Sequence, residues 1–234
     1  MQSSEGFLLR KFQYREADYI LSIFTRDIGK IRGIARNAKR STKRFGGRLE
    51  PFIKFIVDFS TNSRGMHSIE DVTTIKPYSK IVDDFELFLW GNVIIELTDV
   101  ITPIEESNVS MFGLLDNTLS RLEKGVNTLP VILNFILKAL SLSGYKPNIT
   151  NCVKCGNQVK NSTVFNIKGG GVLCSRCSGN IRGAKISLEV LNDEEFMQIH
   201  LSKVLEHIKI FIRFAEYHTE KELKSAKFIE DIKI

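Results

Sequence analysis

The chain has 234 residues, of which 43% are hydrophobic and 26% are charged, and its formal net charge is +6. This composition is typical of a globular protein that can bury a sizeable core. The first residues lack a basic region leading into a long apolar stretch, which argues against a secretory signal. The longest charge-free run, residues 125–137, is too short to span a bilayer, so we expect a cytoplasmic protein without membrane contact.

The positive charge is concentrated at one end of the chain. Residues 1–80 contain 16 Lys and Arg against 8 Asp and Glu, a net of +8, whereas the remaining 154 residues contain 17 against 19. Such asymmetry predicts a polyanionic partner for the N-terminal third. A smaller basic region follows, because residues 141–188 contain 7 basic and no acidic side chains.

The first 80 residues have the pattern of β structure. Apolar and β-branched runs separated by turn residues occur at about 5–12, 18–26, 29–36, 49–59 and 66–75. Five short strands in about 80 residues fit a small closed barrel. We therefore expect residues 1–80 to form an OB-fold that binds nucleic acid, with an SH3-like barrel as the nearest rival.

An uninterrupted basic segment lies within this region. No acidic residue occurs between residues 30 and 48, and the eight cations there are Lys30, Arg32, Arg36, Lys39, Arg40, Lys43, Arg44 and Arg48. We interpret the segment as a phosphate-binding surface on which Phe45 stacks against a base. The alternative is a solvated, highly charged loop without a ligand. A membrane-surface role would require a basic amphipathic helix, which this stretch does not make.

From residue 83 the apolar residues recur at helical spacing. Helices are expected at about 83–101, 109–123, 128–144, 188–199 and 201–223. Residues 81–234 are therefore predicted to form a helical domain, so that the whole chain belongs to the α+β class. A short hairpin is expected inside it, at 163–167 and 172–173.

All four cysteines fall into two closely spaced pairs, Cys152 with Cys155 and Cys174 with Cys177. This spacing predicts four thiolates around one structural zinc ion, in a module at about 148–180 inserted between helices. Two redox-active dithiols or two disulfides are the alternatives, and a disulfide needs an oxidising compartment to which nothing here points. A site of four cysteines is coordinatively full, so the ion should hold the fold rather than catalyse a reaction.

Enzyme motifs are not found. The chain has neither a Gly-x4-Gly-Lys-Ser/Thr phosphate loop nor a Gly-x-Gly-x-x-Gly after a strand, and its four histidines form no His-Glu-x-x-His pattern. The acidic pair Glu105-Glu106 and the run Asp193-Glu194-Glu195 are better explained as acids at helix N-termini than as catalytic carboxylates. We expect a binding protein rather than an enzyme.

Together these segments resemble the bacterial RecO recombination mediators. The similarity is carried by residues 6–10, 14–18 and 24–30, and most specifically by residues 43–52. That last stretch, Lys-Arg-Phe-Gly-Gly-Arg-Leu-Glu-Pro-Phe, resembles the family's Ser-Arg-Phe-x-Gly-x-Leu-Gln-Pro-Phe signature. The four-cysteine module after Gly144-Tyr145-Lys146-Pro147 also matches the zinc-bearing members. Lys43 and Glu50 depart from the signature, which has serine and glutamine there.

The resemblance implies several functional properties. These are an N-terminal OB-fold, a helical domain with a zinc finger, binding to single- and double-stranded DNA, and ATP-independent annealing of complementary strands. It also implies RecR and the single-strand binding protein SSB as partners in loading the recombinase RecA, and therefore a place at the nucleoid. A protein-interaction adaptor with only weak DNA contact is the alternative function.

Overall fold

The computed structural model describes residues 1–61, 66–125, 127–160, 163–179, 183–192 and 200–232. The chain divides into two compact units, Met1–Lys124 and Gly125–Ile234, and each is described by itself. No helix within the described residues is long and apolar enough to cross a membrane.

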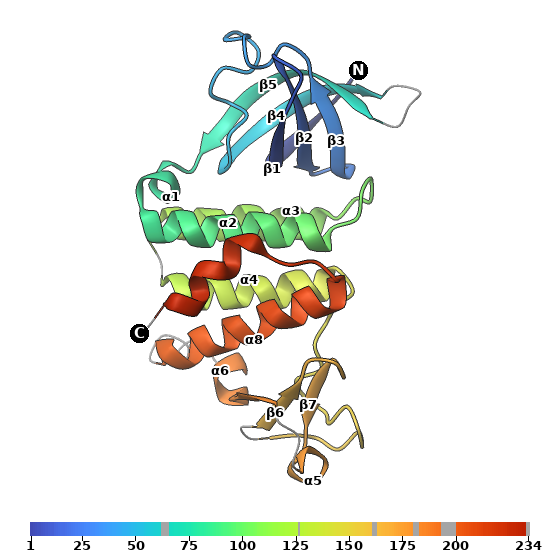
Figure 1. Ribbon diagram of the computed structural model, residues 1–234, viewed down its shortest axis with the longest axis vertical. Coiled ribbons are helices and arrows are strands. Elements are labelled where there is room, and N and C mark those ends of the chain that lie inside the picture. The colour runs from blue at the N-terminus through green and yellow to red at the C-terminus, as the bar shows by residue number, and fades with distance from the viewer. Residues whose placement is uncertain (62–65, 126, 161–162, 180–182, 193–199, 233–234) are drawn as a thin grey trace. The chain divides into compact units, whose positions relative to one another are not determined.

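The first unit begins with a closed five-stranded barrel (Figure 1). Its strands are β1 Gln2–Tyr14, β2 Asp18–Thr25, β3 Gly29–Ala35, β4 Ile53–Thr61 and β5 His67–Pro77. The order β1-β2-β3-β5-β4 closes because β1 pairs with both β2 and β4, and only β3 and β5 run parallel. This is the Greek-key topology of an OB-fold, as the strand pattern predicted. It rules out the alternative of an SH3-like barrel.

Side chains along these strands alternate between the inside and the outside of the barrel. On β2 and β4, residues Leu21, Ile23, Phe55 and Val57 point inward and have no exposed surface. A closed sheet leaves no unpaired edge, and its inward residues form one continuous core. Residues from the segment between β3 and β4 complete that core, namely Ala38, Phe45 and Leu49.

Three helices follow the barrel in the same unit. They are α1 Ser79–Asp83, α2 Phe85–Ile101 and α3 Val109–Glu123. The two long helices begin at side-chain caps, since Asp84 accepts a hydrogen bond from Leu87 N and Asn108 accepts one from Met111 N. Helix α1 was not predicted, because a segment of five residues is too short to show the helical periodicity of apolar residues.

Partly buried polar contacts fasten α3 to the barrel. Asp116 of α3 accepts a hydrogen bond from the Tyr78 hydroxyl and pairs with Lys54 Nζ at 3.0 Å. The barrel therefore ends near the predicted boundary at residue 80, while the compact unit extends to Lys124 and includes the first part of the expected helical domain.

The second unit is built on two long helices, α4 Thr128–Leu142 and α8 Leu201–Thr219, which pack against each other. A three-stranded antiparallel sheet is inserted between them, in the order β7-β6-β8, with β6 Thr163–Asn166, β7 Gly171–Leu173 and β8 Ala184–Ile186. The hairpin of β6 and β7 was predicted, and β8 is an addition. The remaining elements among the described residues are α5 Ser175–Ser178, α6 Leu188–Asn192 and the 3-10 helix η1 Lys224–Asp231.

The inserted sheet shares a core with the helices. Phe165 of β6 meets Phe211 and Phe214 of α8 edge-on, with ring centroids 5.3 and 5.6 Å apart. The module is thus an integral insertion, as expected, rather than a tethered finger. The helix predicted at 188–199 is seen as α6 up to residue 192, and positions 193–199, with the acidic run there, lie outside the described residues.

Candidate nucleic-acid interface and candidate metal centre

The first part of the basic segment lies on β3, and from Arg36 onward it is a run of turns between β3 and β4, which we call the basic loop. It is anchored to the turn between β1 and β2. Lys39 N donates to Ala17 O at 3.0 Å, and Asn37 N donates to Asp18 Oδ1 at 2.8 Å. These bonds hold the loop's backbone in place and bring two neighbouring turns together.

Five of the eight cations have exposed side chains, namely Arg32 on β3 and Arg36, Lys39, Arg40 and Lys43 in the loop that follows it. One of them has an acidic neighbour, because Arg40 lies 3.5 Å from Glu16. Both side chains of that pair are mostly exposed, so it stabilises the fold by at most about 1 kcal/mol and can exchange for a phosphate contact. We call these five side chains the exposed cation set; four of them lie in the loop after β3, and Arg32 lies on β3 itself.

Two further arginines act on the loop itself. Arg44 donates to Arg36 O at 3.0 Å and Glu70 O at 3.3 Å, and its guanidinium lies 4.8 Å from the Phe45 ring centroid. Arg48 Nη1 donates to Lys43 O at 2.8 Å and also reaches Val72 O at 3.2 Å. Both side chains are half-buried. They were predicted as phosphate ligands, but the structure uses them to brace the loop against β5.

Two predicted DNA contacts are buried and need correction. Lys30 is 5% exposed, and its Nζ lies 2.5 Å from Asp99 O and 3.4 Å from Asp99 Oδ1. Phe45 is 3% exposed and belongs to the barrel core. Neither side chain can meet a phosphate or a base without opening the fold. Sequence reasoning missed this, because Asp99 lies 69 residues away in the chain and charge spacing carries no information about it.

Exposed aromatic residues beside the basic loop were also missed. Phe12 is 54% exposed and Tyr14 is 38% exposed, and both lie near the C-terminal end of β1. The guanidinium of Arg15 lies 5.2 Å from the Tyr14 ring centroid. The alternation of Arg10, Phe12 and Tyr14 along a strand was a signal that could have revealed this face.

The four cysteines converge in the second unit. The Sγ atoms of Cys152, Cys155, Cys174 and Cys177 all lie within 4.8 Å of one another, and Cys155 and Cys174 are 3.6 Å apart. Tetrahedral zinc with bonds of about 2.3 Å places its sulfurs about 3.8 Å apart. None of the four is in a disulfide. The donor set and its spacing therefore fit a metal ion.

Each pair is presented by a tight turn. Gly156 N donates to Cys152 O at 2.8 Å, and Gly156 has a φ of 76°, which a residue with a side chain adopts only with strain. Cys177 N and Ser178 N both donate to Cys174 O, at 3.0 and 2.8 Å. These turns aim both thiols of a pair at the same point.

The protonation equilibria of the thiols also favour a cation. Backbone N–H groups, that of Cys174 first, lower the pKa of Cys152 to about 6 and so stabilise its thiolate. Hydrogen bonds to Cys155 and Cys174 raise the pKa of Cys177 to about 12. Four thiols this close cannot all lose their protons without a positive ion among them.

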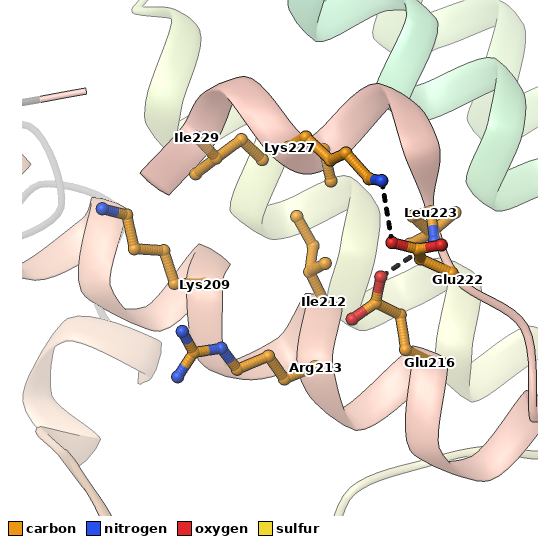
Figure 2. Close-up of a pocket in the computed structure, with 9 residues that line it drawn as sticks. Lys209, Ile212, Arg213, Glu216, Glu222, Leu223, Lys227 and Ile229 are labelled. Carbon is orange, nitrogen blue, oxygen red and sulfur yellow. Dashed lines mark hydrogen bonds and ion pairs between the residues drawn. The ribbon is translucent and has the colours of Figure 1, made fainter. Parts of the chain in front are cut away.

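A separate pocket of about 180 Å³ lies between α8 and η1 in the second unit (Figure 2). Its floor is apolar, and its rim carries charged side chains of both signs, namely Lys209, Arg213, Glu216, Glu222 and Lys227. Lys227 pairs with Glu222 at 3.1 Å, and Glu216 accepts a hydrogen bond from Leu223 N at 2.8 Å.

Comparison with known proteins covers both units. A family model described as recombination protein O N terminal matches residues 1–78, and one described as recombination protein O C terminal matches residues 82–227. The chain is 28% identical over 241 residues to the DNA repair protein RecO of Caldicellulosiruptor saccharolyticus, covering 98% of each chain. It is 33% identical to that of Alkaliphilus metalliredigens, over 80% of this chain and 76% of the relative. For the Streptomyces griseus protein, identity is 30% over 97% of each.

Proposed function

This chain belongs to the RecO family of DNA repair proteins, and from that premise we propose that it binds single-stranded DNA and anneals complementary strands without ATP. The observation that carries the proposal is the exposed cation set of an OB-type barrel. Among the described residues, one of these five side chains pairs with an acid, and this supports their use for phosphate contacts rather than for stabilising the fold.

Annealing needs two properties of a DNA-binding surface. The repulsion between two phosphate backbones must be neutralised, and the bases must stay free to pair. In our proposal the exposed cation set neutralises one strand. The four-cysteine module supports contact with a second strand or with duplex DNA through Lys160, Lys168 and Arg176, which are all exposed.

We assign the four cysteines to one structural zinc ion. Cys152, Cys155, Cys174 and Cys177 would fill its coordination shell and leave no position for a substrate. Bound zinc would fix the two turns relative to the β6–β7 hairpin. The proposed role is architectural, so the metal supports DNA binding by the module only by holding its basic residues in place.

The proposal extends to a mediator role at the nucleoid. Together with RecR, the protein would help to load RecA onto single-stranded DNA coated by SSB. These partners rest on family membership. The pocket between α8 and η1, whose rim has three cations and two carboxylates around an apolar floor, supports docking of a partner segment that combines charged and apolar side chains (Figure 2).

The direct experiment is annealing of two complementary labelled oligonucleotides by zinc-loaded protein without nucleotide, at 50 and 200 mM salt. We expect acceleration at the lower salt concentration and a clear loss at the higher one, because phosphate contacts release counterions. The variant Arg40→Glu/Lys43→Glu should lose the acceleration. No acceleration at either salt concentration by folded protein would contradict the proposal.

A second candidate function is an adaptor that recruits recombination proteins and touches DNA only weakly. The pocket between α8 and η1 is the observation that favours it. An adaptor would show weak DNA binding with little dependence on salt, yet it would retain a complex with RecR or SSB. Measuring both kinds of complex with the same protein sample separates the two functions.

A further inference from the structure

The outer face of β1, β2 and β3 carries an apolar strip beside the exposed cation set. The pairing register places Phe12 opposite Ile20 and Ile20 opposite Ile34, so the three side chains form one cross-strand row. Tyr14 lies two residues beyond Phe12 on the same face of β1. Phe12 and Tyr14 are exposed, while Ile20 and Ile34 are half-buried.

The neighbouring row shows why only part of this face is open. Arg10, Ser22 and Arg32 are opposite one another across the same three strands. Asp99 of α2 pairs with Arg10 and accepts a hydrogen bond from Ser22 Oγ at 3.0 Å. Helix α2 therefore covers one end of the face and leaves the end with Phe12 and Tyr14 uncovered.

Charged side chains of both signs lie around the open end, with cations in excess: Asp18 is opposite Tyr14 in the strand register, and Glu16 is exposed in the turn between them. Arg15 lies against the Tyr14 ring, and the turn that follows Tyr14 is hydrogen-bonded to the basic loop through Ala17 O and Lys39 N. Arg36 continues β3 directly beyond the apolar row. A ligand for this face must therefore combine flat apolar surfaces with negative charge spaced along a chain.

We propose that Phe12 and Tyr14, supported by Ile20 and Ile34, form a base-stacking strip that selects single-stranded over duplex DNA. The inference rests on the proposed DNA-binding function and names the residues that give it strand selectivity. Aromatic rings beside a cationic groove hold unpaired bases by their faces, whereas a duplex keeps those faces stacked inside. Phosphates on either side of the bound bases meet Arg36 and Lys39.

Stacking is compatible with annealing because of which surface of the base it uses. A base lying on an aromatic ring is held through its face, so its hydrogen-bonding edge still points outward. Bases held in this way are separated from one another and presented to an incoming strand. The strip therefore adds the ordering of bases to the charge neutralisation supplied by the exposed cation set.

The test is titration of Phe12→Ala, Tyr14→Ala and the double variant against three fluorescent ligands of equal length. These are a thymidine oligonucleotide, a duplex, and a strand made of abasic sites that retains every phosphate. We expect each single variant to bind the oligonucleotide about 5- to 150-fold more weakly. Binding to the duplex and to the abasic strand should change by less than about twofold.

Two further variants serve as controls. Phe85→Ala removes an aromatic side chain that is 77% exposed at the start of α2, away from the strip, and should bind all three ligands like the parent protein. Phe12→Trp should restore affinity for the oligonucleotide, and its fluorescence should be quenched on binding. The native Trp90 is fully buried and gives a constant background.

Either of two results would overturn the inference. One is unchanged affinity for the oligonucleotide in the double variant, and the other is an equal loss for all three ligands. Failure of the proposed function has a different signature, because the parent protein itself would then bind no strand in a salt-dependent way. Thermal unfolding of each variant, expected within about 3 °C of the parent, shows that the barrel remains intact.

Discussion

The barrel and the four-cysteine module are both basic, but they hold their shape in different ways. The barrel closes on itself around a core that includes Leu21, Phe55 and Phe59, none of which has exposed surface. The module has strands of four and three residues, and much of its turn structure is organised around the cysteines. We therefore expect hydrophobic burial to stabilise the barrel, and a bound metal ion to add to the apolar contacts of Phe165 in stabilising the module.

This difference determines what each basic surface depends on. In the barrel, cations are free to serve a ligand because apolar side chains and two bracing arginines maintain the loop. In the module, we expect Lys160, Lys168 and Arg176 to keep their positions only while the four thiolates share an ion. Removing metal should therefore abolish one basic surface and leave the other.

The largest expected effect separates the two regions directly. Cys152→Ser removes a thiolate from a site whose metal binding contributes on the order of 10 kcal/mol to folding of comparable modules. We expect loss of bound zinc, measured by mass spectrometry of the metal, and loss of amide protection around β6 and β7. Amides of the barrel should keep their protection. Equal loss of protection in the barrel would contradict the comparison.

The reciprocal change is made in the barrel core. Leu21→Ala removes a fully buried side chain from β2 and should lower the free energy of unfolding of the first unit by about 2–5 kcal/mol, because a cavity remains. Denaturant titration measures this loss. Zinc content should stay at one ion per chain, and loss of the ion would show that the two regions are not separately stabilised.

Within the basic loop, bracing and exposed cations should behave oppositely. Arg48→Ala removes hydrogen bonds to three carbonyl oxygens and should destabilise the first unit by about 1–3 kcal/mol. Lys39→Ala should change stability by less than about 0.5 kcal/mol and yet weaken DNA binding. Denaturation and DNA titration of the same two variants provide the test. A loss of DNA binding alone in Arg48→Ala would refute its bracing role.

A smaller effect depends on pH and belongs to the second unit. Burial lowers the pKa of His207, whose Nε2 accepts a hydrogen bond from Ser187 N at 2.9 Å. The unfolded chain then binds more protons than the folded one below about pH 6.5, so stability falls as the pH drops through that range, by up to about 1.4 kcal/mol per pH unit. Zinc-loaded His207→Gln should show a shallower decrease between pH 7 and 5.5. An identical slope in both proteins would exclude His207 as the cause.

The local sequence pattern predicted the strands and helices well, but it predicted the roles of individual side chains less well. Alternation such as that of Leu21 and Ile23 is a property of neighbouring residues, so all five strands and the long helices were predicted within a few residues. The cysteine pairs were likewise recognised by spacing alone. In contrast, the burial of Lys30 depends on Asp99, and the burial of Phe45 depends on how the loop folds over the barrel. Such contacts are tertiary and leave no local signal.

The salt dependence of binding to single-stranded DNA tests the central claim most directly. If the five cations of the exposed set each meet a phosphate, a plot of log K against log[salt] should have a slope of about −3.5. Arg40→Gln/Lys43→Gln should reduce the slope to about −2.1, while Lys80→Gln, an exposed cation elsewhere in the first unit, should leave it unchanged. A slope near zero, or one that the double substitution does not alter, would contradict the account.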